Sequence, residues 1–149
     1  MFKNLKLLIL ILILCISLGG IASARWDSYE SEPHVAISSN SIPAGTSTAL
    51  SDCTALRVEG TIRFLEVQTR MTFNASGGSD VVVGVYTSVD NVNYDTEKLT
   101  SDTITVVAGE TVQKTFFLSP DALWYKFTVD NSSSSYAITG TTVTVIKKN

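Results

Sequence analysis

Cysteine and histidine are scarce in this chain of 149 residues, which contains two cysteines and one histidine. We expect Cys15 to be removed with an N-terminal signal, so Cys53 is left without an internal disulfide partner. The domain must then be held together by packing, by a bound ion or by association with other chains. We expect Cys53 to be buried as a small apolar residue, which is the usual environment of a free cysteine.

The sequence also lacks the motifs of common enzymes. Its single histidine, His34, lies beside Pro33 and far from any serine or cysteine in a nucleophile motif, which excludes a triad that needs a histidine of the same domain. The patterns G-x-S-x-G and H-E-x-x-H and the phosphate-binding glycine loop do not occur. A carboxylate pair for glycoside hydrolysis stays open, but most acids fall in predicted turns, where they usually serve as solvated caps. We therefore predict that the protein is not an enzyme.

Positive charge is sparse. Eleven Lys and Arg stand against fourteen Asp and Glu, and removal of Lys3 and Lys6 with the signal leaves nine against fourteen, a net charge of −5. Binding of nucleic acid depends on clustered basic residues that neutralise phosphates. We therefore expect no nucleic-acid partner.

The chain begins with the pattern of a secretory signal. Lys3 and Lys6 precede the apolar run Leu7–Leu18, and Ala22-Ser23-Ala24 supplies the small-x-small site of a signal peptidase. We expect cleavage after residue 24, a secreted protein located outside the cell or at its surface, and no membrane contact after cleavage. The apolar stretch 7–24 also reaches the lower limit of about eighteen residues for a membrane span, so a retained anchor stays open as the alternative.

Residues that favour β-structure dominate the rest of the chain. It holds eighteen threonines and fifteen valines after residue 24, and β-branched residues suit the pleated surface of a sheet. Period-two alternation recurs between turn residues, with no sustained helical period. We predict an all-β fold, a single antiparallel two-sheet β-sandwich of jelly-roll or immunoglobulin-like type with about eight strands. The predicted strands are His34–Ser38, Ala55–Val58, Thr61–Phe73, Val81–Val89, Thr103–Val107, Val112–Leu118, Trp124–Val129 and Tyr136–Ile146.

The alternation changes parity within two of these strands. Ile62 and Phe64 share one parity, whereas Leu65 and Val67 share the other, so one face cannot bury both sets without an interruption. We predict a bulge or a change of sheet near Phe64–Leu65. The parity changes again around Gly140, where we predict a bend.

Three segments are expected in total: a signal peptide at 1–24, an extended N-terminal arm at 25–48 and the sandwich at 49–149. The arm is polar and turn-prone, and it contains Pro33 and Pro43. The arm contains one segment with alternating apolar residues, which we predict pairs with a neighbouring subunit. This segment consists of His34, Val35, Ala36, Ile37 and Ser38.

One acidic loop has the composition of a calcium site. Oxygen-bearing side chains recur there, and calcium binds six to eight oxygens on a flexible loop. The loop lacks the sixth-position glycine and closing glutamate of a helical calcium hand. A hairpin turn capped by its own side chains is the alternative. The calcium ligands would be Asp90, Asn91, Asn93, Asp95 and Glu97.

The same stretch carries a family resemblance. The segment Tyr86-Thr87-Ser88-Val89-Asp90-Asn91-Val92-Asn93-Tyr94-Asp95 resembles the signature Ser-x-Asp-Gly-x-x-Tyr/Trp of discoidin-like sandwich modules. It is also similar to β-sandwich modules of prokaryotic cell-surface and phage-appendage proteins. Asn91 stands where these families usually place glycine, and asparagine tolerates the same left-handed conformation. The resemblance implies a secreted sandwich that binds a ligand or forms assemblies, and it transfers no individual site residue.

Two aromatic side chains and two asparagines are further candidates. Alternation places Tyr125, Phe127 and Val129 on the core face, which directs Trp124 outward or to an interface. We predict that Trp124 and Tyr136 contact a glycan or a partner, although Trp124 covering the sandwich edge is an equally good interpretation. Asn74 and Asn131 both begin N-x-S triplets in predicted turns and are candidate N-glycosylation sites.

Two functional classes follow from these observations. The favoured one is a secreted structural subunit that self-assembles into an extracellular filament or surface appendage by donating its N-terminal arm as a strand to a neighbour. The alternative is a monomeric, secreted carbohydrate-binding or adhesion module. The arm distinguishes them, because it is ordered only in a neighbour in the first class, whereas in the second it packs on its own domain or stays a flexible tether.

Overall fold

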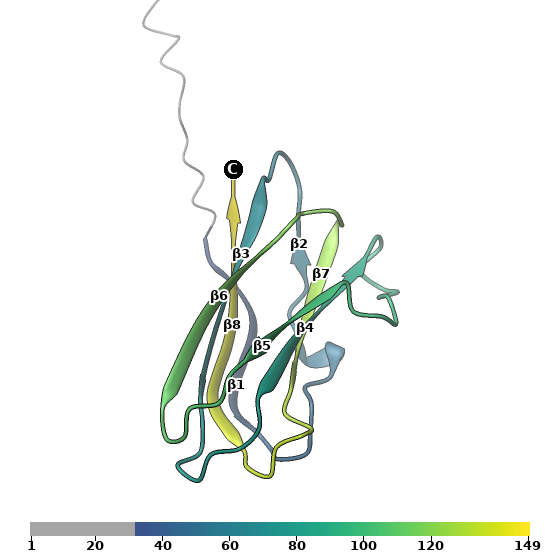
Figure 1. Cartoon of the computed structure of the whole chain (residues 1–149). Helices are drawn as coiled ribbons and strands as arrows, with labels where there is room; N and C mark the ends of the chain where they lie inside the picture. Colours follow the sequence, from purple (N-terminus) through teal and green to yellow (C-terminus); the bar gives the residue numbers. More distant parts are fainter. Residues whose placement is uncertain (1–31) are drawn as a thin grey trace, which may run out of the picture.

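The computed structural model describes residues 32–149, which form two antiparallel four-stranded sheets (Figure 1). Sheet A has the strand order β1-β8-β3-β6 and sheet B the order β2-β7-β4-β5. The prediction of an all-β, two-sheet sandwich with eight strands is confirmed. The elements are β1 (His34–Ile42), the short 3-10 helix η1 (Leu50–Asp52), β2 (Leu56–Arg57), β3 (Phe64–Thr72), β4 (Val81–Ser88), β5 (Thr100–Ile104), β6 (Thr111–Leu118), β7 (Trp124–Asp130) and β8 (Ile138–Lys148).

The expected signal peptide and the first residues of the expected arm, 25–31, lie outside the described residues. Within the described part of the chain, no helix has the length and apolar character needed to cross a membrane.

Alternate residues of each central strand build the core between the sheets. Tyr125, Phe127 and Val129 are fully buried, which confirms the core face predicted for this strand. From β3, Leu65 and Val67 point inward and are equally buried. Burial of one such side chain stabilises the fold by roughly 1.5–3 kcal/mol, so this alternation is the main determinant of which face each strand turns inward.

The two predicted parity changes have different outcomes. The predicted bulge or change of sheet at Phe64–Leu65 is wrong, because β3 begins at Phe64 and pairs regularly with β8 from Phe64 to Arg70. Ile62 precedes the strand and packs on the core from a loop, so its parity imposes nothing on β3. The bend at Gly140 is confirmed, because the pairing with β3 shifts between Arg70 and Thr72 and Gly140 has a left-handed φ of 55°.

The described part of the expected arm forms strand β1, which pairs antiparallel with β8 of the same chain. Ala36, Ile37 and Ile42 of this strand are buried in the core. A register shift between Val35 and Ile37 accommodates two consecutive inward residues. In this chain the sandwich therefore begins at His34, and its first strand is an edge strand of sheet A.

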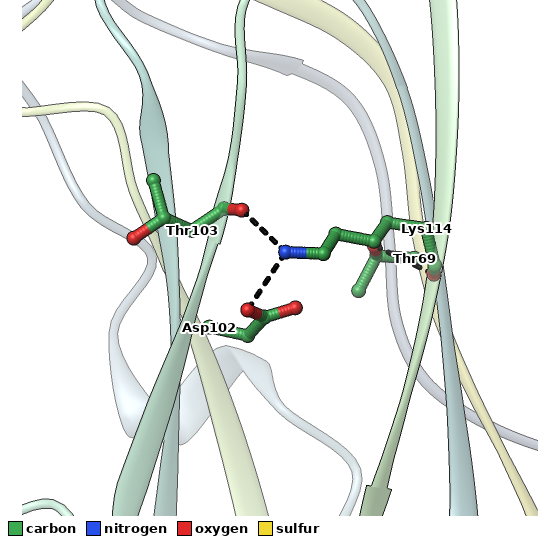
Figure 2. Close-up of polar contacts among 4 residues, drawn as sticks. All are labelled: Thr69, Asp102, Thr103 and Lys114. Carbon is green, nitrogen blue, oxygen red and sulfur yellow. Dashed lines mark hydrogen bonds and ion pairs between the residues drawn. The ribbon is translucent and has the colours of Figure 1, made fainter.

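An inter-sheet ion pair closes the edge of the sandwich where β5 and β6 lie (Figure 2). Lys114 on β6 faces inward opposite Thr69, and its Nζ lies 2.8 Å from Asp102 Oδ1 and donates a 2.8 Å hydrogen bond to the Thr103 carbonyl on β5. Thr69 Oγ1 donates to the Lys114 carbonyl at 3.1 Å. Inward-pointing charges on edge strands disfavour pairing with a strand of another molecule, so this edge is protected.

The free thiol Cys53 also has a structural role. It is buried and accepts a hydrogen bond from the Phe127 backbone N–H at 3.1 Å. Thr48 Oγ1 likewise accepts a hydrogen bond from the Val129 backbone N–H at 2.9 Å. Side chains of the segment before β2 thereby satisfy the edge of β7, as buried backbone donors require.

Candidate functional site

An open groove of about 440 Å³ is lined by residues from both sheets, among them Lys147 near the C-terminus. Figure 1 marks the end of the sandwich at which the C-terminus lies. The groove is formed where the start of β1, strand β2, the first residue of β7 and the end of β8 come together. Its walls combine apolar, aromatic, basic and acidic groups, which suits a ligand with both apolar and polar surfaces. The lining residues are Glu32, Pro33, His34, Ala55, Leu56, Arg57, Trp124 and Lys147.

Trp124 is placed in the groove by strand pairing. It is the first residue of β7 and lies opposite Arg57 of β2 and Ser88 of β4. The outward direction predicted for Trp124 agrees with its half-buried side chain. The Arg57 guanidinium lies 5.5 Å from the centroid of the Trp124 ring, a cation–π contact worth about 0.5–1 kcal/mol at an exposed site.

A carboxylate also holds Arg57. The Nη2 atom of Arg57 lies 2.6 Å from Glu59 Oε1, and both side chains are more than half exposed. The guanidinium is therefore fixed between a ring and an acid at the rim of the groove. Exposed pairs of this kind exchange readily with other anions, because each contributes only about 0–1 kcal/mol.

His34 forms a wall of the groove and is held by the backbone. Its Nε2–H donates to the Thr54 carbonyl at 3.2 Å, and the Thr54 N–H donates to the Ala36 carbonyl at 2.9 Å. These two bonds join β1 to the segment that leads into β2. His34 therefore has a structural partner, and it positions one side of the groove.

The outer face of sheet B continues from the groove. Lys126, two residues after Trp124 on the same strand, lies opposite Tyr86 of β4. Its ammonium group is 4.9 Å from the centroid of the Tyr94 ring. Farther along, the Lys98 side chain covers Gly84, where an added Cβ would approach it to 3.0 Å. Aromatic rings and basic side chains are thus neighbours on this face.

The acidic loop between β4 and β5 folds on its own hydrogen bonds. Asp90 Oδ1 accepts the backbone N–H groups of Val92 and Asn93 at 2.9 and 2.8 Å, and Oδ2 accepts the Asn93 side-chain amide at 2.8 Å. These donors, led by the Asn93 backbone, hold the pKa of Asp90 well below its usual range. Ser88 Oγ accepts the Asn91 N–H at 3.1 Å, so the Ser-x-Asp pattern builds the turn itself.

Asn91 has a left-handed φ of 63°, which confirms that asparagine can take the glycine position of this turn. Its Oδ1 accepts a hydrogen bond from the Tyr94 hydroxyl at 2.7 Å. Asp95 accepts a hydrogen bond from the Thr87 hydroxyl, and Glu97 is exposed. No three Asp, Glu, His or Cys side chains of residues 32–149 come together as metal ligands would. The side-chain oxygens of Asp90, Asn91 and Asp95 thus accept hydrogen bonds from the loop and from the end of β4.

The two candidate glycosylation asparagines have different environments. Asn74 is exposed at a turn, where its Oδ1 accepts the Ser76 N–H at 2.8 Å. Asn131 is only 1% exposed, and its Nδ2 donates to the carbonyls of Ile42, Pro43 and Tyr136 at 3.4, 3.0 and 3.0 Å. The folded chain therefore presents only Asn74 to a modifying enzyme.

The remaining candidates are dispersed. Tyr136 is 40% exposed and precedes β8, away from the residues that line the groove. Of the patch predicted to pair with a neighbour, only His34 lines the groove, whereas Ala36 and Ile37 are core and Val35 and Ser38 are exposed.

Sequence analysis did not name Arg57, Lys126 or Lys147 as site residues. A usable signal exists for Lys126, because it follows Trp124 by two residues and so shares its face of the strand. Arg57 lies opposite Trp124 through the pairing of β2 with β7, and Lys147 lines the same groove from β8 of the other sheet. The sequence holds no local signal for either approach. Comparison of the chain with protein-family models and with curated proteins found no match.

Proposed function

We propose that this chain is a secreted, non-enzymatic β-sandwich module that binds a glycan at the groove around Trp124 and acts in adhesion. The observation that carries the proposal is a half-buried tryptophan in an open groove with charged side chains on its rim. An aromatic ring supplies a flat apolar surface, and the polar rim supplies hydrogen bonds that orient the ligand.

The hydrogen bonds made by His34, Cys53 and Asp90 support a non-enzymatic role. His34 donates to a backbone carbonyl, Cys53 is a buried hydrogen-bond acceptor, and Asp90 caps a turn. Burial raises the pKa of the Cys53 thiol, which disfavours the thiolate that a nucleophile needs.

The strand order supports a jelly-roll arrangement over an immunoglobulin-like one. Both sheets are four-stranded, and each pairs strands from the two halves of the chain in the orders 1-8-3-6 and 2-7-4-5. Jelly rolls occur among lectin domains. This is an analogy of fold, so the proposal still depends on the groove.

The test is binding of the mature chain, residues 25–149, to a glycan array. Trp124→Ala is expected to weaken binding about tenfold or more, equivalent to about 1.4 kcal/mol. The matched control is Phe117→Ala, which removes an exposed ring on the outer face of sheet A, and binding should be unchanged. Thermal melting of each variant checks folding, and Trp124→Phe replaces Trp124→Ala if the latter unfolds.

Two results would contradict the proposal. One is a folded mature chain that binds no glycan on the array. The other is glycan binding that both tryptophan substitutions leave unaltered, which would place the ligand elsewhere on the molecule.

Self-assembly into a filament or surface appendage is the second candidate. The observation in its favour is that β1 is an N-terminal edge strand whose pairing partner in its sheet is β8. A copy that releases β1 from its own β8 and inserts it beside the β8 of a neighbour would form the same hydrogen bonds. The buried side chains Ala36, Ile37 and Ile42 would then cross between subunits.

A further inference from the structure

Basic and aromatic side chains form a strip on the outer face of sheet B. We call this the Trp124 strip and define it by Arg57, Tyr86, Trp124 and Lys126. Arg57 lies opposite Trp124, and Lys126 lies opposite Tyr86. Because residues two apart on a strand point to the same face about 6.6–6.8 Å apart, Lys126 follows Trp124 directly along the strip.

This strip contrasts with the charge of the whole chain, which has eleven basic and fourteen acidic residues. One carboxylate, Glu59, pairs directly with Arg57 at 2.6 Å. The ammonium group of Lys126 contacts the ring of Tyr94 at 4.9 Å. The groove adds Lys147 and His34 against the single acid Glu32.

The two cations differ in what they offer an anion. A guanidinium presents a planar set of donors that matches a carboxylate, whereas an ammonium acts as a point charge. Glu59 already forms an ion pair with Arg57, which is the contact that a carboxylate of the ligand would make. The ligand anion must therefore compete with Glu59 for this guanidinium, while Lys126 has no such competitor within hydrogen-bonding distance among residues 32–149.

We infer that the glycan bound at the groove is an acidic saccharide, with a sugar ring against Trp124 and its anionic groups paired with Arg57 and Lys126. This inference rests on the proposed function and narrows it to one chemical class. The aromatic ring binds the apolar face of the sugar, and the flanking cations select the acid. Competition with Glu59 makes a specific prediction, since removal of that carboxylate should strengthen binding.

The experiment is calorimetry of the mature chain with polygalacturonate and with its fully methyl-esterified form, which has the same backbone without the charge. We expect polygalacturonate to bind about tenfold more tightly and its affinity to fall as salt is raised. Lys126→Gln should weaken binding about fivefold, and Glu59→Gln should strengthen it about threefold. Lys148→Gln on sheet A is the matched control, and its affinity should equal that of the parent.

The outcomes separate this inference from the function on which it rests. Equal binding of both polymers, or array hits confined to neutral glycans, would overturn the acidic class and leave the glycan-binding module standing. A folded chain that binds no glycan would overturn both. Tighter binding to a DNA duplex than to polygalacturonate would overturn the inference in favour of nucleic acid, and an unchanged affinity of Glu59→Gln would remove Arg57 from the contact.

Discussion

Two asparagines with the same local motif have opposite roles at the scale of the residue. Asn74 and Asn131 each begin an N-x-S triplet. Asn74 caps an exposed turn, whereas Asn131 is buried. The Asn131 amide binds three carbonyls from the end of β1 and the approach to β8. The Asn131 side chain, directly after β7, thus joins the end of β1 to the segment that precedes β8.

Asn131→Asp is expected to lower the free energy of unfolding by about 3 kcal/mol or more, because a carboxylate would face three carbonyl oxygens without a donor. Asn74→Asp is the matched control. It retains the oxygen that accepts the Ser76 N–H, so its effect should stay within about 0.5 kcal/mol. Urea unfolding measures both. Equal losses for the two variants would show that the Asn131 amide does not fasten these strands.

The buried thiol of Cys53 is expected to make the stability of the fold depend on pH. Burial raises the pKa of this thiol above its ordinary value of 9.0, and burial likewise raises the pKa of Tyr125 above 10.0. A group whose pKa is raised by folding keeps its proton in the native state while the unfolded chain loses it. Its stabilising contribution is complete below the unfolded pKa and is lost as the pH rises above it.

The free energy of unfolding should therefore decrease above about pH 9, measured by urea unfolding between pH 7 and pH 11. Cys53→Ala removes the ionisable thiol, and its stability should decrease less steeply between pH 9 and pH 10, before tyrosines dominate. If parent and variant curves run parallel over that interval, the thiol is not protected by burial.

At the scale of the element, the two open edges of the sandwich are managed differently. The edge made by β5 and β6 carries the inward ion pair of Asp102 and Lys114, with side chains 25% and 43% exposed. The opposite edge is covered by residues 46–58, whose backbone and side chains bond to β7 and β1. The first edge is closed by an ion pair that points between the sheets, whereas the second is covered by a segment of chain.

Lys114→Met is expected to cost about 1–2 kcal/mol, because it leaves a partly buried carboxylate without its cation. The double substitution Lys114→Met with Asp102→Leu should recover much of this loss. It also removes the charge that opposes edge pairing, so the double variant should self-associate more than the parent in size-exclusion chromatography with light scattering. A double variant with the elution profile of the parent would show that these charges do not protect the edge.

At the scale of the whole molecule, the two outer faces have different chemistry. The outer face of sheet B carries the Trp124 strip. The outer face of sheet A exposes Phe64 and Phe117, whose rings meet edge to face at 5.5 Å and are 37% and 64% exposed. The described chain starts and ends at the same end of the sandwich (Figure 1), so the groove lies next to the point where the N-terminal segment joins.

Disulfide trapping decides whether β1 stays in its own molecule. Ser38 and Thr142 are direct cross-strand partners, a geometry that brings Cβ atoms close enough for a disulfide. In a Cys53→Ala background, Ser38→Cys and Thr142→Cys in one chain should give an intramolecular bond and monomeric mobility on non-reducing gels.

A mixture of the two single-cysteine chains, refolded together and oxidised, supplies the control. Absence of a mixed dimer is expected for the binding module. A mixed dimer, or a ladder of higher species from the double-cysteine chain, would instead establish strand exchange and support the assembly function.

The sequence by itself determined the features that depend on local side-chain direction. Alternation along each strand places every second residue on one face, so most strands, the core of β7 and the bend at Gly140 could be predicted from neighbouring residues. The strand expected at Thr103–Val107 is an exception, because β5 spans Thr100–Ile104. The outward direction of Trp124 followed from the same rule. Turn chemistry is equally local, and the left-handed Asn91 was predicted correctly.

Only the tertiary structure decided what depends on pairing between distant strands. Serines at 38, 39 and 41 weaken the apolar pattern of β1, yet pairing with β8 extends the strand expected at His34–Ser38 to Ile42. The burial of Asn131, the pairing of Lys114 with Asp102 and the groove that Arg57 and Lys147 share with Trp124 likewise depend on contacts between segments far apart in the sequence. Alternation fixes which way a side chain points along its own strand, but the residue that it meets is set by the strand packed beside it.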